Sequence, residues 1–153
     1  MSVLKAHGLS IELPRGWEGR IYRRMGGDPT LHAANYTLPA ADGDFGGSAT
    51  QRMPHGGSFL VLTEYQPGQG LAPGEGLFAA EAIPLPLHPG QFHPRTLHVA
   101  RPGQRGFQHF FTAGRRPFCL YAVIKPRASG TTAAAAAAEV AAVNGVLATV
   151  AID

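Results

Sequence analysis

One stretch decides the fold of this chain: Ser58-Phe59-Leu60-Val61-Leu62-Thr63-Glu64-Tyr65. Successive side chains of a strand point to opposite faces of its sheet, and both sets are apolar here, with Phe59 and Val61 on one face and Leu60 and Leu62 on the other. A second stretch has the same character, Phe118-Cys119-Leu120-Tyr121-Ala122-Val123-Ile124. Strands that are apolar on both faces belong to the covered middle of a sheet. We therefore predict that both stretches are central strands.

Weaker patterns on either side predict the remaining elements. Residues 9–13 alternate apolar and polar side chains and end at a turn, Pro14-Arg15-Gly16-Trp17. Further strands are predicted at 18–24, 31–38, 96–100, 107–112 and 149–152, and short turns would join 96–100, 107–112 and 118–124 into a meander. A helix is predicted to begin at Thr131 or Thr132, with a buried stripe formed by Ala136, Val140, Val143 and Leu147. Residues 40–57 form either a short helix or a loop, and a helical turn fits 75–82.

These elements predict an α+β fold with a single antiparallel sheet. The sheet would have about six to eight strands, end in the meander, and be packed by the C-terminal helix and one or two short helices. A length of 153 residues fits one domain spanning 1–153. Residues 67–94 contain six of the 13 Pro and five of the 20 Gly, which predicts a long Pro/Gly-rich loop.

Composition argues against several classes of protein. The single Cys excludes an internal disulfide framework, and the net charge of +3 comes mostly from Arg scattered along the chain, which does not favour nucleic-acid binding. The N-terminus lacks the features of a signal peptide, and Glu139 and Asn144 interrupt the apolar C-terminal stretch. We therefore expect a cytoplasmic protein that does not enter the membrane.

The order of these elements resembles that of the Mog1/PsbP-like fold. The resemblance is carried by the opening strand with its Pro-x-Gly-Trp turn, Pro14-Arg15-Gly16-Trp17, by the meander ending in 118–124, and by the final helix and short strand. It implies an α/β/α sandwich and the accessory, noncatalytic character of many members. This chain lacks the targeting segment of the photosystem-associated members and the partner-binding signature of the nuclear-transport members. No functional residue is therefore carried over.

Searching for catalytic chemistry yields few candidates. His88, His93 and His98 are five residues apart, which in an extended chain puts neighbours on opposite faces, so they would share a metal only if the loop folded back. Cys119 lies in a predicted buried strand and is expected to be unreactive. Glu64 ends a central strand, where a carboxylate needs a partner such as Arg23 or Arg115, or else lies in solvent at the rim. We predict no cofactor, no metal ligand and no catalytic residue.

Two functional hypotheses remain. The first is a noncatalytic accessory or protein-interaction module, which could form homodimers through its edge strands. Its surface would use residues with exposed apolar or cationic side chains, namely Arg15, Trp17, Phe45, Phe78, Phe92 and Arg95. In the alternative arrangement, the aromatic side chains fold back as a lid over the sheet. The second hypothesis is a small-ligand or metal-binding protein, with a pocket between the sheet and the 67–94 loop containing Glu64, His88 and His93.

Overall fold

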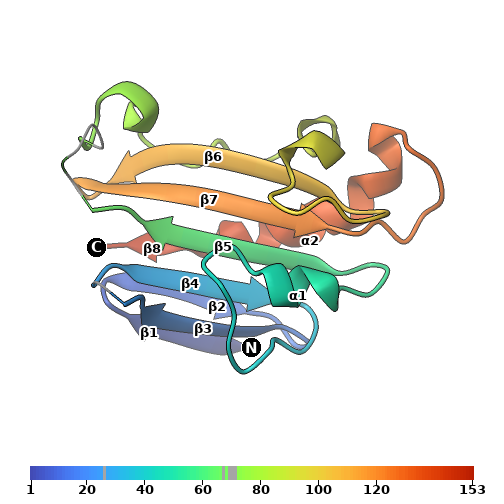
Figure 1. Cartoon of the computed structure of the whole chain (residues 1–153), viewed down its shortest axis with the longest axis horizontal. Helices are drawn as coiled ribbons and strands as arrows, with labels where there is room; N and C mark the ends of the chain where they lie inside the picture. The colour runs from blue at the N-terminus through green and yellow to red at the C-terminus, as the bar shows by residue number, and fades with distance from the viewer. Residues whose placement is uncertain (26, 67, 69–71) are drawn as a thin grey trace.

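Two antiparallel sheets organise the structure, a computed structural model that describes residues 1–25, 27–66, 68 and 72–153 (Figure 1). The larger sheet has five strands in the order β3-β4-β5-β7-β6, and the smaller has three in the order β1-β2-β8. The larger comprises β3 (Glu18–Arg23), β4 (Pro29–Ala34), β5 (Ser58–Glu64), β7 (Arg116–Ile124) and β6 (Arg105–Ala113). The smaller comprises β1 (Ser2–Ala6), β2 (Leu9–Leu13) and β8 (Ala151–Ile152). The predicted α+β class with antiparallel strands is confirmed.

The two stretches that are apolar on both faces form the centre of the larger sheet, as predicted. β5 pairs with β4 on one edge and β7 on the other, and β7 pairs with β5 and β6. Every residue of β7 after Arg116 is buried, and β5 is buried up to Thr63. This burial leaves only the ends of the β5–β7 ladder to carry charge.

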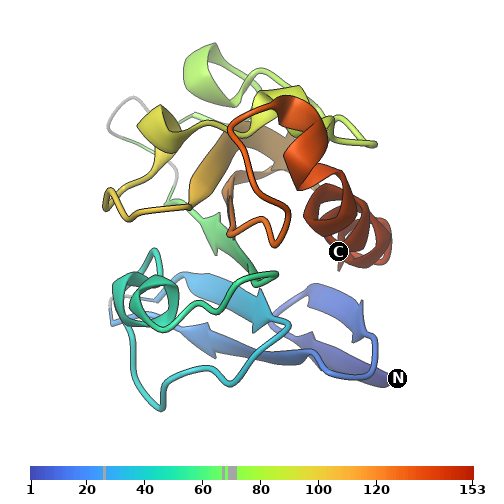
Figure 2. The same cartoon turned by 90° about the vertical axis from the view of Figure 1, so that its right-hand side faces the viewer.

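Helix α2 and the smaller sheet cover one face of the larger sheet, which we call the inner face. α2 (Ala137–Leu147) follows a 3-10 turn at Ala133–Ala136. The predicted stripe is confirmed, because Ala136, Val140, Val143 and Leu147 are all buried in one cluster with Leu60, Leu120 and other inner-face residues. Figure 2, turned by 90°, shows α1 and α2 on opposite sides of the larger sheet.

The opposite, outer face is covered by the chain between β4 and β5. This segment forms the short helix α1 (Gly47–Gln51), so the helix alternative for 40–57 is correct. The Asp42 carboxylate accepts the backbone N–H groups of Ser48 and Ala49 at 2.9 Å and so satisfies two free donors of the first turn. Gly46 has φ 71°, and a Cβ there would lie 2.2 Å from the Phe59 ring. A side chain at this position would push α1 off the sheet.

The prediction of a single sheet is wrong. β2 has a partner on each edge, β1 and β8, so it has no free edge with which to join β3. After the turn at Pro14–Trp17 the chain instead packs against the first hairpin through side chains. A Cβ on Gly19 of β3 would lie 2.9 Å from atoms of both Leu4 and Leu13. The strand β1 was not predicted, because its residues are exposed or half-exposed.

The predicted strand at 96–100, and with it the three-stranded meander, is also wrong. Residues Pro94–Thr96 form a 3-10 turn, and the chain stays irregular until β6 begins at Arg105. The edge of β6 at Gly106 is paired with His93 instead, through N–H···O distances of 2.9 and 2.8 Å. The remaining hairpin, β6–β7, is joined by Gly114 and Arg115 in left-handed conformations.

Most of the predicted 67–94 loop is described, and it packs against the larger sheet and α2; residues 67 and 69–71 lie outside the described part. Thr112 of β6 donates its N–H to the Ala80 carbonyl at 2.8 Å, and the Leu87 N–H donates to Asn144 of α2 at 2.7 Å. The expected helical turn is a single 3-10 turn at Gly76–Phe78. No helix in the described part of the chain has the length and apolarity needed to cross a bilayer.

Candidate functional site

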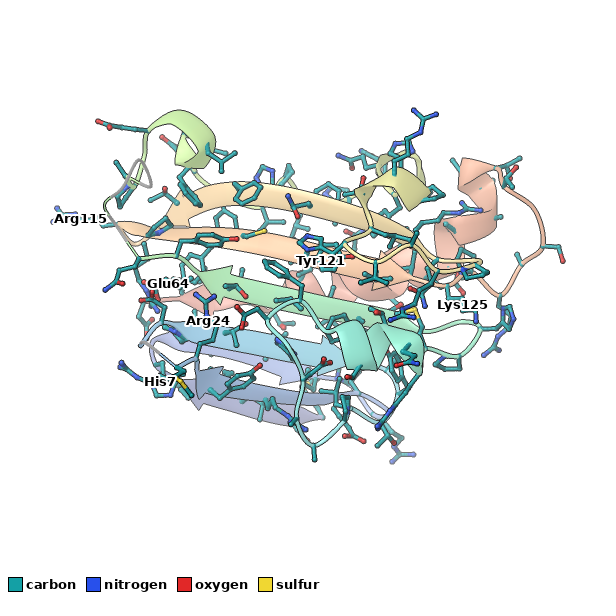
Figure 3. The ribbon with its side chains drawn as sticks, in the orientation of Figure 1. His7, Arg24, Glu64, Arg115, Tyr121 and Lys125 are labelled. Carbon is teal, nitrogen blue, oxygen red and sulfur yellow. The ribbon has the colours of Figure 1, made fainter. Side chains whose placement is uncertain are left out.

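At one end of the β5–β7 ladder, Arg116 pairs with Glu64. The guanidinium donates to both carboxylate oxygens, at 2.6 and 3.1 Å, and both side chains are largely buried (Figure 3 labels Glu64). Arg116 also donates to the backbone carbonyls of His7 at 2.9 Å, Gly8 at 3.4 Å and Asp153 at 3.1 Å. We call this set of contacts the Arg116 hub. It joins the first hairpin, the larger sheet and Asp153.

The expected partners of Glu64, Arg23 and Arg115, are both incorrect. Glu64 lies opposite Phe118 in the ladder, so Arg116, two residues along the same face, is within reach. Arg115 is exposed at the hairpin turn, and Arg23 donates to His7 Nδ1 at 3.2 Å. The Glu64 carboxylate is thus engaged in a structural ion pair.

A cleft of about 720 Å³ lies at the other end of the same ladder. It is bounded by residues 89–94 of the long loop, by 101–105 before and at the start of β6, by 126–133 after β7, and by His55. We call it the arginine cleft, because its charged and titratable lining residues are Arg101, Arg105, Arg127, His55 and His93. No Asp or Glu occurs among the described residues that line it.

Backbone carbonyls hold two of these arginines in place. Arg105 donates from Nη1 to Thr132 O at 2.8 Å and from Nη2 to Gly130 O at 2.9 Å. Arg101 donates from Nη2 to Gly47 O at 3.1 Å. Within the described ranges, neither guanidinium has a carboxylate oxygen within 4.0 Å. Among the described contacts, their charges are therefore met only by neutral hydrogen-bond acceptors.

Arg127 is exposed and lies against the chain before β5. A Cβ on Gly56 would come within 2.9 Å of its guanidinium, so Gly56 leaves the space that this side chain occupies. The nearby carboxylate of Glu139 is buried, accepts the backbone N–H of Arg127 at 3.3 Å and lines an adjoining hollow, which shares Arg127 and Ala128 with the cleft. Among described contacts, the Arg127 guanidinium makes no hydrogen bond or ion pair, which leaves it the most available cation of the cleft.

Neutral hydrogen-bonding groups complete the cleft. The Gln104 side chain is 4% exposed and donates from Nε2 to Thr50 O at 2.7 Å, while its Oε1 is buried and has no described partner. Residues 128–131 form bends along the cleft wall. Their backbone N–H groups donate none of the described backbone hydrogen bonds outside helices and strands. The cleft wall thus combines cations with residues whose backbone N–H groups have no described backbone acceptor.

A second, smaller pocket of about 360 Å³ lies on the outer face beside β3. Tyr22 and Arg20 of β3 and His32 of β4 form one wall, and residues 38–42 form the other. Burial lowers the pKa of His32, and burial raises the pKa of Tyr22. Both side chains are therefore uncharged at neutral pH.

The predicted site residues are not gathered at one place. His93 lines the arginine cleft, while His88 is exposed outside the described linings and Glu64 is at the opposite end of the ladder. In the expected interaction surface, Phe78 and Phe92 are 0% and 3% exposed, which matches the alternative in which they fold back as a lid. Trp17 packs on the inner cluster and Phe45 on the outer one, and of the six residues only Arg15 and Arg95 are exposed.

Two chemical expectations can be compared with the structure. Cys119 is buried in β7, and burial raises the pKa of its thiol to about 12, in agreement with the expected low reactivity. Among the residues described, no three His, Cys, Asp or Glu side chains are grouped closely enough to hold a metal ion. The histidines at 88, 93 and 98 do not form a cluster of that kind.

No protein-family model matches the chain, and neither the curated proteins nor the solved structures include a significant match. The resemblance to Mog1/PsbP-like proteins therefore stays a prediction.

The grouping of Arg101, Arg105 and Arg127 was not predicted from the sequence. A local signal does exist, because Arg101 and Arg105 flank the Pro102-Gly103 turn and both precede the predicted strand at 107–112. Arg127 follows β7 by three residues, and the pairing of Arg105 with Ile124 in the β6–β7 ladder brings it to the same end of the sheet. Tyr22 and His32 were missed because each is a single residue in a pattern typical of a strand.

Proposed function

We propose that this protein binds a small anionic ligand and that the phosphate group of this ligand occupies the arginine cleft. One observation carries the proposal: three Arg and two His line a single cleft of about 720 Å³, and none of its described lining residues is acidic. Cations held together without counter-charges repel one another, and a bound anion relieves this repulsion. The volume is within the range of small-molecule sites, about 300–1,000 Å³.

The donor geometry favours an oxyanion. A guanidinium has five N–H donors, and the described side-chain hydrogen bonds of Arg105 and Arg101 use two donors each. The remaining donors can bond oxygens in the cleft while the carbonyl contacts hold the guanidinium groups in position. Such charge-assisted hydrogen bonds are about twice as strong as neutral ones. A phosphate, with several charged oxygens, can engage more than one arginine at once.

This proposal develops the ligand-binding hypothesis from the sequence, in a modified form. The cleft includes Pro89, Gly90, Phe92, His93 and Pro94, which belong to the 67–94 loop, but it includes neither Glu64 nor His88. The hypothesis of a noncatalytic accessory or interaction module, with its homodimer, stays a prediction. We favour ligand binding because unpaired arginines that share one cleft are a specific feature, whereas no Phe, Trp or Tyr residue of the described chain is exposed.

The test is isothermal titration of the protein with inorganic phosphate at low ionic strength. We expect binding, and we expect the double variant R101Q/R127Q to lose at least tenfold in affinity, because two charged donors are removed. The matched control is R15Q/R115Q, which changes the net charge equally at two exposed arginines outside the described cavities. The control should bind phosphate with an affinity close to that of the wild type.

Two results would contradict the proposal. One is the absence of heat on titration with millimolar phosphate. The other is an equal loss of affinity in R101Q/R127Q and R15Q/R115Q, which would show that overall charge, and not the cleft, attracts the anion.

A further inference from the structure

The small pocket on the outer face combines a polar wall with an apolar wall. Tyr22, Arg20 and His32 form the polar wall, and Leu38, Pro39, Ala40 and Ala41 form most of the other. Its volume of about 360 Å³ is at the lower end of the range for ligand sites. We call it the Tyr22 pocket. Neither of the functional hypotheses drawn from the sequence uses these residues.

His32 fixes the direction of the hydrogen bonds on the polar wall. Its side chain is buried, and Nε2 lies 3.2 Å from the carbonyl oxygen of Asp44 and 3.4 Å from the hydroxyl oxygen of Tyr22. A carbonyl oxygen can only accept, so Nε2 must carry the proton and donate it. Tyr22 then cannot donate to Nε2. Its own hydroxyl proton is left available to an acceptor in the pocket.

The charge of Arg20 has no described carboxylate partner. Nη1 donates to Ala40 O at 2.7 Å, and no carboxylate oxygen lies within 4.0 Å of this guanidinium in the part of the chain that the structure describes. Asp42 also lines the pocket, but its oxygens already accept the N–H groups of Gly43 and Ser48 at one atom and Ala49 at the other. The backbone donors at the start of α1 thus offset the negative charge of Asp42.

From this arrangement we infer that the Tyr22 pocket binds a small aromatic carboxylic acid. Its carboxylate would accept hydrogen bonds from Arg20 and from the Tyr22 hydroxyl, and its ring would pack against Leu38, Pro39, Ala40 and Ala41. The two walls match the two parts of such a ligand, because a carboxylate needs charged donors and a ring needs apolar contact. The inference uses no residue of the arginine cleft and does not depend on the proposed phosphate site.

Benzoate titration followed by NMR chemical shifts tests this inference, with benzamide as the uncharged ligand of nearly the same shape. We expect benzoate to bind and benzamide to bind at least tenfold more weakly. Y22F, which removes only the hydroxyl, should weaken benzoate binding severalfold, and R20Q should weaken it at least tenfold. R15Q, which removes an exposed Arg outside the pocket, should leave the affinity unchanged.

Three outcomes would overturn the inference: no shift with millimolar benzoate, equal affinity for benzoate and benzamide, or unchanged benzoate affinity in Y22F and R20Q. If R20Q fails to fold, Y22F and the benzamide comparison still decide. Loss of benzoate binding in R101Q/R127Q, with Y22F unaffected, would assign the carboxylate to the arginine cleft instead. Phosphate titration tests the arginine cleft separately. A negative result at either the cleft or the Tyr22 pocket therefore does not affect the conclusion for the other.

Discussion

The two ends of the β5–β7 ladder hold arginines in opposite circumstances. At one end, Arg116 forms a bidentate ion pair with Glu64 and binds three backbone carbonyls. At the other, Arg101, Arg105 and Arg127 face a shared cleft with no carboxylate among its described lining residues. Figure 3 shows this separation along the ladder, with Glu64 labelled near one end and Lys125 near the other.

The comparison distinguishes two uses of arginine: the charge of Arg116 stabilises the fold, whereas the charges of the arginine cleft are available to a ligand. A largely buried Arg with a carboxylate partner has its interactions satisfied within the chain, and removing it leaves the partner unpaired. An Arg anchored only by neutral acceptors, as Arg101 and Arg105 are, keeps its net charge. We therefore expect substitution of Arg116 to lower mainly stability and substitution of Arg127 to lower mainly anion binding, whereas Arg105, which anchors the cleft wall, should affect both.

The largest expected effect is that of R116A at the hub. The substitution leaves Glu64 largely buried without its cation and removes three contacts to carbonyls, so we expect a loss of about 3 kcal/mol in the free energy of unfolding. Urea denaturation measures it. R115A, at the exposed neighbour on the hairpin turn, is the control and should cost less than about 0.5 kcal/mol. Similar losses in both variants would show that the hub is not a stabilising centre.

An intermediate effect is expected for R105K in the cleft. A lysine can bond one of the two carbonyls, Gly130 O and Thr132 O, that Arg105 now bonds, so we expect a loss of about 1–2 kcal/mol. Thermal denaturation checks the stability, and phosphate titration of the same variant checks the binding. If stability is unchanged, Arg105 does not anchor the cleft wall.

A smaller effect on stability is expected from the titration of His32, which lies on β4 away from both the hub and the cleft. Burial lowers the pKa of His32 in the folded state below its ordinary value of 6.5, so below pH 6.5 the unfolded chain binds a proton that the folded chain does not. This contribution therefore reduces stability as the pH falls from 6.5 towards the folded pKa, by at most about 1.4 kcal/mol per pH unit. Urea midpoints at pH 7.5 and 5.5 should differ more for the wild type than for H32Q. An equal pH dependence in both would contradict the assignment.

The smallest stability effect is expected for R127Q. Arg127 makes no described side-chain hydrogen bond, and losing one of several like charges relieves repulsion, so this variant should differ from the wild type by less than about 0.5 kcal/mol. Denaturation in the absence of phosphate is the measurement. A loss of unfolding free energy as large as that of R116A would show that this arginine of the cleft stabilises the fold as much as the Arg116 hub does.

The sequence predicted the middle of the fold better than its edges. β5, β7 and the stripe on α2 were correctly predicted because burial on both faces, or along one helical face, leaves a local pattern. In the smaller sheet, the strands at 9–13 and 149–152 were predicted, but no local pattern indicates that they pair with each other. β2 pairs with β8 through Leu9 and Ile152, residues at opposite ends of the chain, and β1 is too exposed to show alternation.

The candidate site was less predictable than the fold. Arg105 and Arg127 are 22 positions apart and meet only because β6 and β7 pair antiparallel. Single residues such as Tyr22 and His32 show no motif, since their chemistry depends on the residues opposite them in the sheet. Phe78 and Phe92 illustrate the reverse error, because an aromatic residue in a loop can be buried as completely as one in a strand.

The Arg116 hub has a consequence for the rates of folding and unfolding. Its contacts join residues that are 52 positions apart for Glu64 and 108 for Gly8. Contacts so distant in sequence are costly to close, and we expect them to form after the local hairpins, late on the folding path. Interactions that form after the transition state slow unfolding without speeding folding. The hub would then slow unfolding, and it would affect the lifetime of the folded state more than the rate of folding.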